Sequence, residues 1–435
     1  MVDKQQLRNF RQALVQNEEV LAPDDARYVE NLHGSNEEDV INLLCDDILT
    51  SGSELFYFTG QRGTGKSTEL RRLETMLNDE DVQTIRFDSL DYISDTDPVS
   101  AETLLLLVTA GLADWAKERY GEQYLKEAAW TRFQNWLQTE IEIREISAAG
   151  IKAALKERQA TVIEKVRTLT SKREWTDTIA GFAGLIVEFI RVASRRTRVV
   201  VIVDSLERLR GISGTDQDSM FQHVVTTFAG DFDRLRLPGA SVVYSVPPYL
   251  SLLADVRNYV ECYSLASVRV YENPFKFAAR QPRKSGLDLM TRLIEQRHPT
   301  WGEVLSREAL DRLALNSGGD LRHFMQRLVS AVASQAQFAL DRLPLAADDP
   351  IIERILEENR GETERLTVRS EWSLLHQIAA SHNAIAEDRE NSLRALAHLF
   401  ETRVILNYRN GAEWFDVHPL LWKLIDGYQP AAAAP

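Results

Sequence analysis

The chain has 435 residues, of which 44% are hydrophobic, and this length suggests about three domains with ample material for cores. Its net charge of −14 gives no overall basic field to attract nucleic acid or an anionic membrane, so any such contact must be local. The two cysteines, Cys45 and Cys262, are too few for a disulfide framework or a metal cluster, which is typical of a reducing cytosol. The N-terminus lacks the apolar core of a signal peptide, and no apolar window suits a membrane span. The sequence therefore predicts a soluble, cytoplasmic protein.

Residues 1–50 predict a helical lead-in segment, in which Lys4–Val15 and Glu37–Leu49 have the spacing of amphipathic helices. The stretch that follows, Leu55–Thr68, reads LFYFTGQRGTGKST and contains the phosphate-binding loop pattern, with Gly60 followed four residues later by Gly65-Lys66-Ser67. An apolar strand precedes this loop, and a helix at Glu69–Leu77 follows it, so the helix N-terminus points at the same anion.

The residue types of this loop explain how it would hold a nucleotide. Glycines let the backbone amides turn inward around phosphate oxygens, the lysine reaches the β- and γ-phosphates, and the serine hydroxyl ligates Mg²⁺. The residues expected to contact nucleotide here are Gly60, Gly63, Thr64, Gly65, Lys66, Ser67 and Thr68.

A second strand is expected at Gln83–Phe87 and a helix at Glu102–Trp115. The charged, helical stretch over residues 116–196 then interrupts the nucleotide domain as an insertion. It would be either a helical cap with a solvated face or a partner-binding arm.

Arg198–Asp204, RVVVIVD, has five apolar β-formers in a row, which predicts a strand buried on both faces of a parallel sheet. Asp204 ends this strand and would hold Mg²⁺ together with Ser67, as a Walker B carboxylate does. Glu207 lies three residues further and would orient or deprotonate the attacking water. The alternative for Glu207 is a surface residue that starts a helix.

The next strand is expected at Ala240–Val246, a helix at Tyr249–Asn258, and the last strand of the sheet at Glu261–Tyr271. Lid helices follow over residues 276–345, where Ser317-Gly318-Gly319-Asp320 ends one helix and caps the next. Arg322 would project from the first turn of that helix over the phosphates and report their number by charge. The alternative is an exposed helix arginine.

In residues 346–428, helices precede two short strand candidates, Arg403–Tyr408 and Glu413–Val417, around Arg409-Asn410-Gly411, which predicts a hairpin and a winged helix. From Arg365 to Tyr428, seven basic and eight acidic residues give a charge of −1. A DNA-binding domain usually has one clearly basic face. The count favours a winged helix that binds protein, without excluding DNA. The tail, Gln429–Pro435, is expected to be disordered.

Four motifs together resemble the AAA+ and STAND ATPases, best their initiator-like and STAND members: GQRGTGKST, VVVIVDSLER, SGGDLRHF and the C-terminal winged helix. The order of these parts covers nearly the whole chain outside the insertion. No guanine-reading Asn-Lys-x-Asp pattern follows the last strands, which favours ATP over GTP.

The resemblance implies roles for further residues. Arg27-Tyr28-Val29 would cover the adenine, or pack as ordinary surface. Ser245 would sense the γ-phosphate, or be a plain strand residue. Arg257 lies where an arginine acting in trans would sit, or it caps a helix dipole. The segment FDVHPL resembles the MHD motif, so that His418 would read the ADP phosphate, although Pro419 replaces the motif's Asp; the alternative is a core histidine. The distance between Asp204 and Glu207 departs from the adjacent acid pair of AAA+ motors and implies slow turnover.

The sequence thus predicts an α/β P-loop NTPase with a parallel sheet, divided into the lead-in (1–50), the ATPase domain (51–275), the helical lid (276–345), the winged helix (346–428) and a tail (429–435). Its expected function is that of an ATP-binding, slowly hydrolysing regulatory ATPase that uses ATP/ADP and Mg²⁺ and switches a protein partner, with homo-oligomer formation open. The alternatives are a DNA-associated, initiator-like or transposition-regulator-like ATPase and a non-hydrolysing nucleotide-binding scaffold.

Overall fold

The computed structural model describes residues 2–15, 20–35, 38–52, 54–94, 99–121, 129–140, 173–208, 221–278, 280–384 and 389–428. The chain forms two compact units, which are described separately. The first, here called the P-loop unit, comprises Met1–Val40, Gly60–Arg71 and Leu265–Pro435. The second, the sheet unit, comprises Ile41–Thr59 and Arg72–Ser264. The finer division into five parts stays a prediction.

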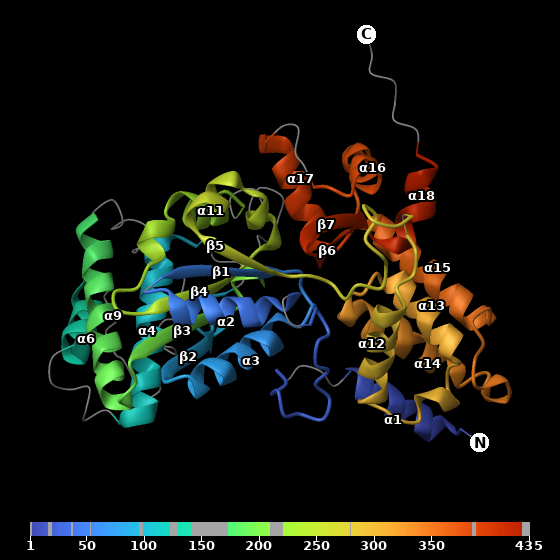
Figure 1. Cartoon of the computed structure of the whole chain (residues 1–435), viewed down its shortest axis with the longest axis horizontal. Helices are drawn as coiled ribbons and strands as arrows, with labels where there is room; N and C mark the ends of the chain where they lie inside the picture. The colour runs from blue at the N-terminus through green and yellow to red at the C-terminus, as the bar shows by residue number, and fades with distance from the viewer. Residues whose placement is uncertain are drawn as a thin grey trace, which may run out of the picture. The chain divides into compact units, whose positions relative to one another are not determined.

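The sheet unit is built on a five-stranded sheet in the order β2-β3-β4-β1-β5 (Figure 1). Neighbours β2 and β3, β3 and β4, and β4 and β1 are parallel, which confirms the α/β fold class. The central strands are fully buried apart from Arg198 at the start of β3, because helices cover both faces of a parallel sheet. The strands are β1 (Leu55–Gly60), β2 (Val82–Asp88), β3 (Arg198–Asp204), β4 (Ser241–Val246) and β5 (Glu261–Leu265).

Helices α4 (Ala101–Tyr120), α6 (Ala129–Glu140) and α9 (Arg173–Ser194) lie together at one end of the sheet unit (Figure 1). Aromatic side chains pack between α6 and α9, where the ring centre of Phe133 is 5.4 Å from that of Phe182. The remaining helices are α2 (Val40–Thr50), α3 (Lys66–Asp79), which begins in the P-loop unit, and α11 (Ala254–Tyr259). Residues 122–128 and 141–172 of the expected insertion lie outside the described residues, so its role stays open.

Two expectations about this unit are wrong. The last strand ends at Leu265 and does not continue to Tyr271, because the following amides bond elsewhere: Ser267 N–H donates to Asn407 O over 2.9 Å. The apolar alternation beyond Leu265 instead places Val268 and Val270 in the core of the P-loop unit. The helix expected over Tyr249–Asn258 is divided into a short 3₁₀ turn and α11 by Leu253, whose backbone is extended.

One hydrophobic core of the P-loop unit spans several of its predicted parts. It joins α1 (Lys4–Val15) to the helices of the expected lid and to the C-terminal hairpin, with Leu7, Leu310 and Leu406 all buried in it. The predicted lead-in helix, the lid and the hairpin therefore share this core. The lid elements are α12 (Lys284–Glu295), α13 (Arg307–Ser317), the wide-turned helix η8 (His323–Val329) and α14 (Ser330–Ala336). The next helix, α15 (Pro350–Arg365), lies in the segment expected to form the winged helix.

The C-terminal part contains α16 (Trp372–Ser381), α17 (Arg389–Glu401), β6 (Ile405–Asn410), β7 (Ala412–Val417) and α18 (Trp422–Asp426). Strands β6 and β7 are antiparallel, with Asn410 opposite Ala412. The turn places Gly411 at φ +76°, a conformation that glycine adopts without strain. The hairpin predicted from Asn-Gly is therefore confirmed, whereas the winged-helix assignment stays a prediction.

None of the helices in the described ranges is long and apolar enough to cross a bilayer. Cys45 is buried and Cys262 is half-buried, and both are free thiols. Burial raises the pKa of the Cys45 thiol to about 11, which keeps it protonated and unreactive near neutral pH.

Gly319 provides a test of how closely the lid turn packs. It has φ +81°, and a Cβ atom there would lie 1.9 Å from the backbone oxygen of Val268. We expect Gly319→Ala to lower the free energy of unfolding by about 2–4 kcal/mol, through backbone strain and overpacking. Denaturant titration followed by tryptophan fluorescence measures this.

The matched control is Gly361→Ala in α15, where a Cβ atom would meet nothing within 4 Å. Alanine is the better helix former, so this variant should gain up to about 1 kcal/mol. Equal stabilities for the two variants would show that the turn is not closely packed against Val268.

Candidate functional site

The predicted phosphate-binding loop has the expected setting: it leaves β1 at Gly60 and enters α3 at Lys66. Gly63 and Gly65 have φ values of +93° and +95°, so both adopt the left-handed conformation that glycine favours. The Thr64 hydroxyl and the Thr64 N–H both donate to Gln61 O, over 2.8 and 3.3 Å. The loop is thus a tight turn closed on itself.

Lys66 is buried, with only 3% of its surface exposed, and its ammonium donates to Gln61 O over 3.0 Å. The lysine therefore folds back over the loop from the first residue of α3. Ser67 and Thr68 follow in the first turn of the helix and are half-buried. A lysine ammonium, glycine-loop amides and a helix N-terminus together favour a bound phosphate.

Residues from the lid lie against this loop. A Cβ atom on Gly63 would be 2.8 Å from Cβ of Arg322, so the glycine leaves the space that the arginine occupies. Leu321 Cδ1 is 3.8 Å from the corresponding position on Gly65. The structure thus brings the predicted phosphate reporter, Arg322, to the phosphate loop, and its role stays a prediction.

His33, which the sequence gave no reason to select, also borders the loop. Its Nε2 lies 3.7 Å from where a Cβ of Gly65 would be. Its Nδ1 is 2.8 Å from the backbone oxygen of Ala266 and must donate to it, because a carbonyl only accepts. In the neutral ring, Nε2 is then the acceptor, on the side that faces Gly65.

The segment Arg27-Tyr28-Val29 also lies beside the loop's helix. The Tyr28 hydroxyl donates to Glu69 Oε1 over 3.1 Å, in the first turn of α3. Arg27 binds Asp25 over 2.7 Å and lowers the pKa of that carboxyl to about 2. Val29 is buried. The segment therefore packs on the phosphate-loop helix, and its proposed cover of an adenine is untested.

The C-terminal hairpin is bonded to the same loop. The side-chain amide of Gln61 donates to the backbone oxygen of Ile405 in β6. The Tyr408 hydroxyl donates to Gly318 O over 2.7 Å, and Arg403 forms a 3.0 Å ion pair with buried Asp320. Nothing in the sequence pattern indicates these contacts, which connect β6 to the loop and to the turn that carries Arg322.

Asp320 has two partners that explain the position of that turn. One carboxylate oxygen accepts the N–H of His323 over 2.9 Å, which confirms the predicted helix cap, and the other accepts from Arg403. Without Arg403, the buried Asp320 carboxylate would keep only the hydrogen bond from the His323 N–H.

His418, the predicted reader of the ADP phosphate, is buried and bonded within the protein. Its Nε2 is 2.9 Å from Nδ1 of His323, whose Nε2 is 3.2 Å from Asn359 Oδ1. The Leu420 N–H donates to His418 Nδ1 over 3.4 Å, so one consistent assignment runs from His418 Nε2–H to His323 and on to Asn359. Burial lowers the pKa of both histidines, which keeps them neutral. The phosphate-reading role of His418 stays a prediction.

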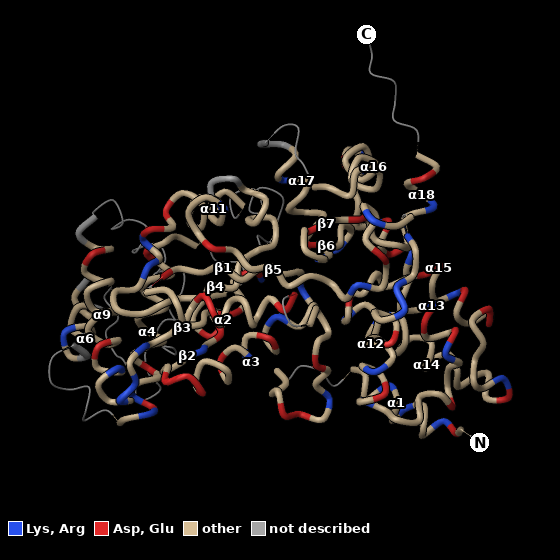
Figure 2. Tube along the Cα trace, in the orientation of Figure 1, with Lys and Arg blue, Asp and Glu red and all other residues tan. Residues whose placement is uncertain are grey.

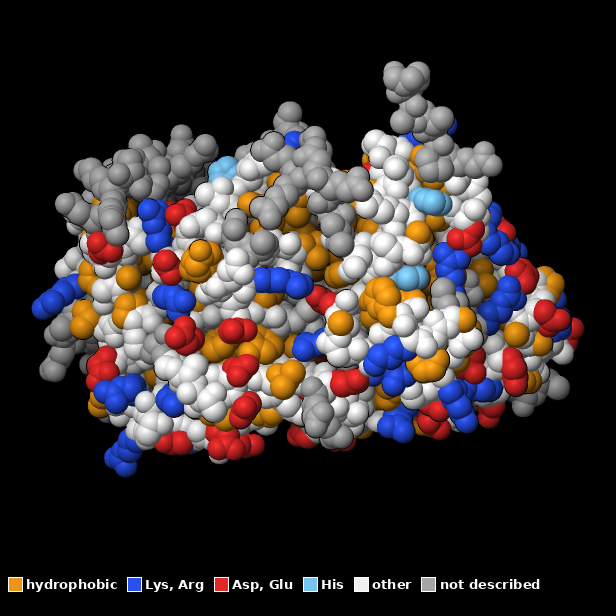
Figure 3. All heavy atoms as spheres, turned by 45° about the horizontal axis from the view of Figure 1, so that its top comes forward, with side chains coloured by type: hydrophobic (Ala, Val, Ile, Leu, Met, Phe, Trp, Pro, Cys, Tyr) orange, Lys and Arg blue, Asp and Glu red, His pale blue; other side chains and the backbone are white. Residues whose placement is uncertain are grey.

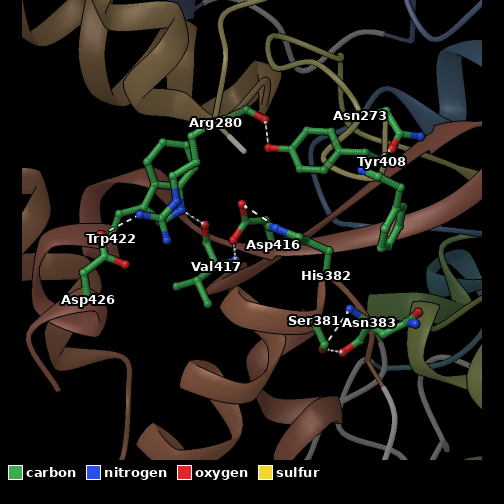
Figure 4. Close-up of polar contacts among 12 residues, drawn as sticks. Asn273, Arg280, Ser381, His382, Asn383, Tyr408, Asp416, Val417, Trp422 and Asp426 are labelled. Carbon is green, nitrogen blue, oxygen red and sulfur yellow. Dashed lines mark hydrogen bonds and ion pairs between the residues drawn. The ribbon is translucent and has the colours of Figure 1, made fainter. Parts of the chain in front are cut away.

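A second polar network joins the linker to the end of the hairpin (Figure 4). The Asp416 carboxylate accepts the Val417 N–H over 2.7 Å and lies 3.7 Å from His382 Nδ1. Arg280 lies over the Trp422 ring, 4.5 Å from its centre, and binds Asp426 over 2.6 Å. Burial raises the pKa of Asp416 to about 7.

In the sheet unit, the predicted residues Asp204 and Ser245 lie at the carboxyl ends of adjacent strands, since Val203 is opposite Tyr244. The Ser245 hydroxyl donates to the Glu207 carboxylate, so two residues selected for separate reasons are in contact. Ser205 has φ +71°, a strained conformation of the kind that concentrates at functional sites. Its hydroxyl donates over 2.9 Å to Asp88, a carboxylate that no sequence motif indicates.

No preformed group of three metal ligands exists among the residues that the structure describes. The Mg²⁺ site expected at Ser67 and Asp204 stays a prediction. Arg257, the candidate trans-acting arginine, donates from Nε to Ser251 O and so supports its own turn. Its trans role is untested.

No protein-family model matches the chain, and no curated protein matches its sequence. Among solved structures, one that it resembles is the ORC2 protein of Aeropyrum pernix in its ADP form. The match covers 96% of both chains at 12% identity, with a TM-score of 0.36. At this distance the match assigns no function, and the site is interpreted from its own residues.

The buried carboxylate of Asp416 predicts a pH dependence of stability. Its pKa is raised from 3.8 to about 7 in the folded state, so the stability it contributes is complete below about pH 4 and is lost as pH rises through 7. Asp416→Asn cannot ionise. Relative to the wild type, it should therefore gain roughly 1–3 kcal/mol of unfolding free energy between about pH 5 and pH 8.

The control is Asp426→Asn, which alters an exposed carboxylate of the same network. Denaturant titrations at the two pH values should show no comparable gain for this variant. A wild type and an Asp416→Asn variant with parallel pH profiles would contradict the assignment.

Proposed function

We propose that the protein is an ATP-binding, slowly hydrolysing regulatory ATPase of the AAA+/STAND kind, which uses nucleotide to control a separate protein partner. The observation that carries this proposal is the phosphate loop itself, with its lysine folded over it, bonded through Gln61 to the C-terminal hairpin. A loop built this way binds phosphate, and a loop bonded to a distant segment gives nucleotide a way to act on that segment.

The residues of the phosphate loop would bind the phosphates of the nucleotide. Inward amides of Gly63 to Lys66 would surround the β-phosphate, and the ammonium of Lys66 would exchange Gln61 O for phosphate oxygens. Ser67 and Asp204 have the hydroxyl and carboxylate groups that Mg²⁺ takes alongside nucleotide phosphates, and the ion would neutralise charge that develops on them.

The strand order brings two of the proposed site residues to neighbouring strands. Strand β4 lies between β1, which leads into the phosphate loop, and β3, which ends on Asp204. In open parallel sheets, ligands bind outside the carboxyl ends of the strands, which is where Ser245 and Asp204 lie. Ser245 on β4 is therefore the residue proposed to meet the γ-phosphate.

The hydrogen bond that the proposed base already makes is consistent with slow hydrolysis. Glu207 would accept the proton of the attacking water as it adds to the γ-phosphorus and ADP leaves. Its carboxylate already accepts a hydrogen bond from Ser245. Turnover would require that bond to be exchanged for the water.

The switch we propose runs through Arg322. Charge at the loop would attract its guanidinium, and Arg322 is two residues from Asp320, which holds Arg403 of the C-terminal part. A change in phosphate number would thus alter the contacts that fix the hairpin and the surface around it. The ADP and ATP states would differ in how firmly the hairpin is held.

A protein partner fits the described surface better than DNA. Of the two basic residues at the hairpin, Arg403 is paired with Asp320. Acidic and basic side chains are interspersed on the face that Figure 3 draws, and the Cα trace shows the same mixing along the chain (Figure 2). A DNA-binding surface needs basic residues gathered on one face.

The direct test is the nucleotide that the freshly purified protein carries, released by denaturation and identified by chromatography. We expect close to one ADP per chain, as in a closed resting switch. Lys66→Ala should weaken ADP and ATP binding by about 10- to 100-fold, the effect of losing one charge-assisted contact to phosphate.

Asp204→Asn is the matched variant, because it should abolish ATP hydrolysis and leave nucleotide binding in place. Binding that is unchanged in Lys66→Ala would contradict the loop assignment. Normal binding with no hydrolysis by the wild type would favour the non-hydrolysing scaffold.

A further inference from the structure

A cavity of about 350 Å³ lies within the P-loop unit, between the lead-in segment and the start of α12. This volume is in the range of small-ligand sites. One wall carries polar groups of the lead-in segment and the other carries three arginines. The lining residues that matter are Asn31, His33, Ser35, Arg269, Arg283 and Arg292.

The charges of this wall do not cancel. Arg269 is paired with Glu38 over 2.6 Å, and the one acidic lining residue, Asp288, is paired with Arg307 over 2.7 Å. Within the described ranges, the guanidinium groups of Arg283 and Arg292 have no ion-pair partner. Among the described residues, two cations without an ion-pair partner therefore border one cavity in a protein of net charge −14.

Arg283 also repels Arg269. Burial, followed by the nearby charge of Arg283, lowers the pKa of Arg269. The same wall holds the start of α12, whose N-cap residue, Arg283, gives no side-chain cap to the helix amides. Gly286 lets this first turn approach closely, since a Cβ atom there would lie 1.8 Å from Arg269 O. An anion would relieve the repulsion and complement the helix N-terminus.

A nucleotide held by the phosphate loop does not explain these charges. Its phosphates belong at Gly63 to Ser67, and its base and ribose are neutral. Neutral groups would give the guanidinium groups of Arg283 and Arg292 no charged partner. The ligand that suits this cavity carries its own negative charge, and planar guanidinium groups bind phosphate oxygens in pairs.

We propose that the cavity binds a phosphate group of a small molecule through Arg269, Arg283 and Arg292. Two sources have this chemistry: a separate phosphate-bearing effector, or a loop nucleotide with an additional phosphate on its ribose. His33 borders both the cavity and the loop, so either ligand would adjoin the nucleotide. The proposal goes beyond ATP hydrolysis and does not depend on it.

The test is calorimetric titration of the full-length protein, saturated with ADP and Mg²⁺, with inorganic pyrophosphate. A parallel titration of nucleotide-free protein compares ADP with ADP that carries a 3′-phosphate. The variant is Arg283→Gln/Arg292→Gln. The control, Arg365→Gln/Arg369→Gln, removes two exposed arginines of the same unit that do not line the cavity. The single variant Arg292→Gln, at an exposed position, replaces the double variant if that does not fold.

A separate effector predicts one pyrophosphate site on the ADP-loaded protein, weakened about tenfold or more in the cavity variant and unchanged in the control. A modified nucleotide predicts that the 3′-phosphate tightens binding about tenfold in the wild type and has no effect in the cavity variant. Neither effect, or equal losses in cavity variant and control, would overturn the proposal.

Pyrophosphate binding to the cavity should also persist in Lys66→Ala. A chain that fails to bind ADP yet retains this binding would refute the proposed ATPase function alone. A chain that binds ADP normally and shows neither effect would refute only the cavity proposal.

Discussion

The backbone oxygen of Ile405 accepts a hydrogen bond from Gln61, and the phosphate loop is thereby bonded to a strand 344 positions further along the chain. The same hairpin shares a core with α1 and the lid helices. Protein cores are close-packed and change between discrete arrangements more readily than they deform gradually. A displacement at the loop or at Arg322 would therefore be passed to the hairpin.

Buried polar groups make this arrangement specific. Asp320 fixes the start of the helix after Gly319 and holds Arg403. The His418–His323–Asn359 chain joins the end of the hairpin to η8 and α15. Such networks stabilise one arrangement only while all their members are paired, because an unpaired buried polar group is costly. They suit a protein with a defined resting state that a ligand can disturb.

Much of the fold could be predicted from local sequence, because local chemistry decides it. Glycines, lysine and flanking apolar runs specify the phosphate loop, five apolar β-formers specify β3, and Asn410-Gly411 specifies the hairpin turn. The extent of β5 could not be predicted, since Val268 and Val270 alternate as in a strand but bury in another core. An apolar alternation indicates that residues are buried, but it does not indicate which element they pack against.

The candidate site shows the same division. Lys66, Arg322, Glu207 and Ser245 were selected by motif, and the structure places Arg322 at Gly63 and Ser245 at Glu207. His33 and the Gln61–Ile405 contact could not be anticipated, because they depend on which distant segments fold together. The cationic cavity is formed by arginines spread over 24 residues of sequence, from Arg269 to Arg292, and has no local pattern.

The central claim is that nucleotide at the phosphate loop changes how the hairpin is held, and hydrogen–deuterium exchange over Ile405–Val417 measures this most directly. The account predicts that exchange in this segment differs between the ADP-bound and ATP-bound protein, and that the difference disappears in Lys66→Ala. Identical exchange in the two nucleotide states, with both nucleotides shown to be bound, would contradict it.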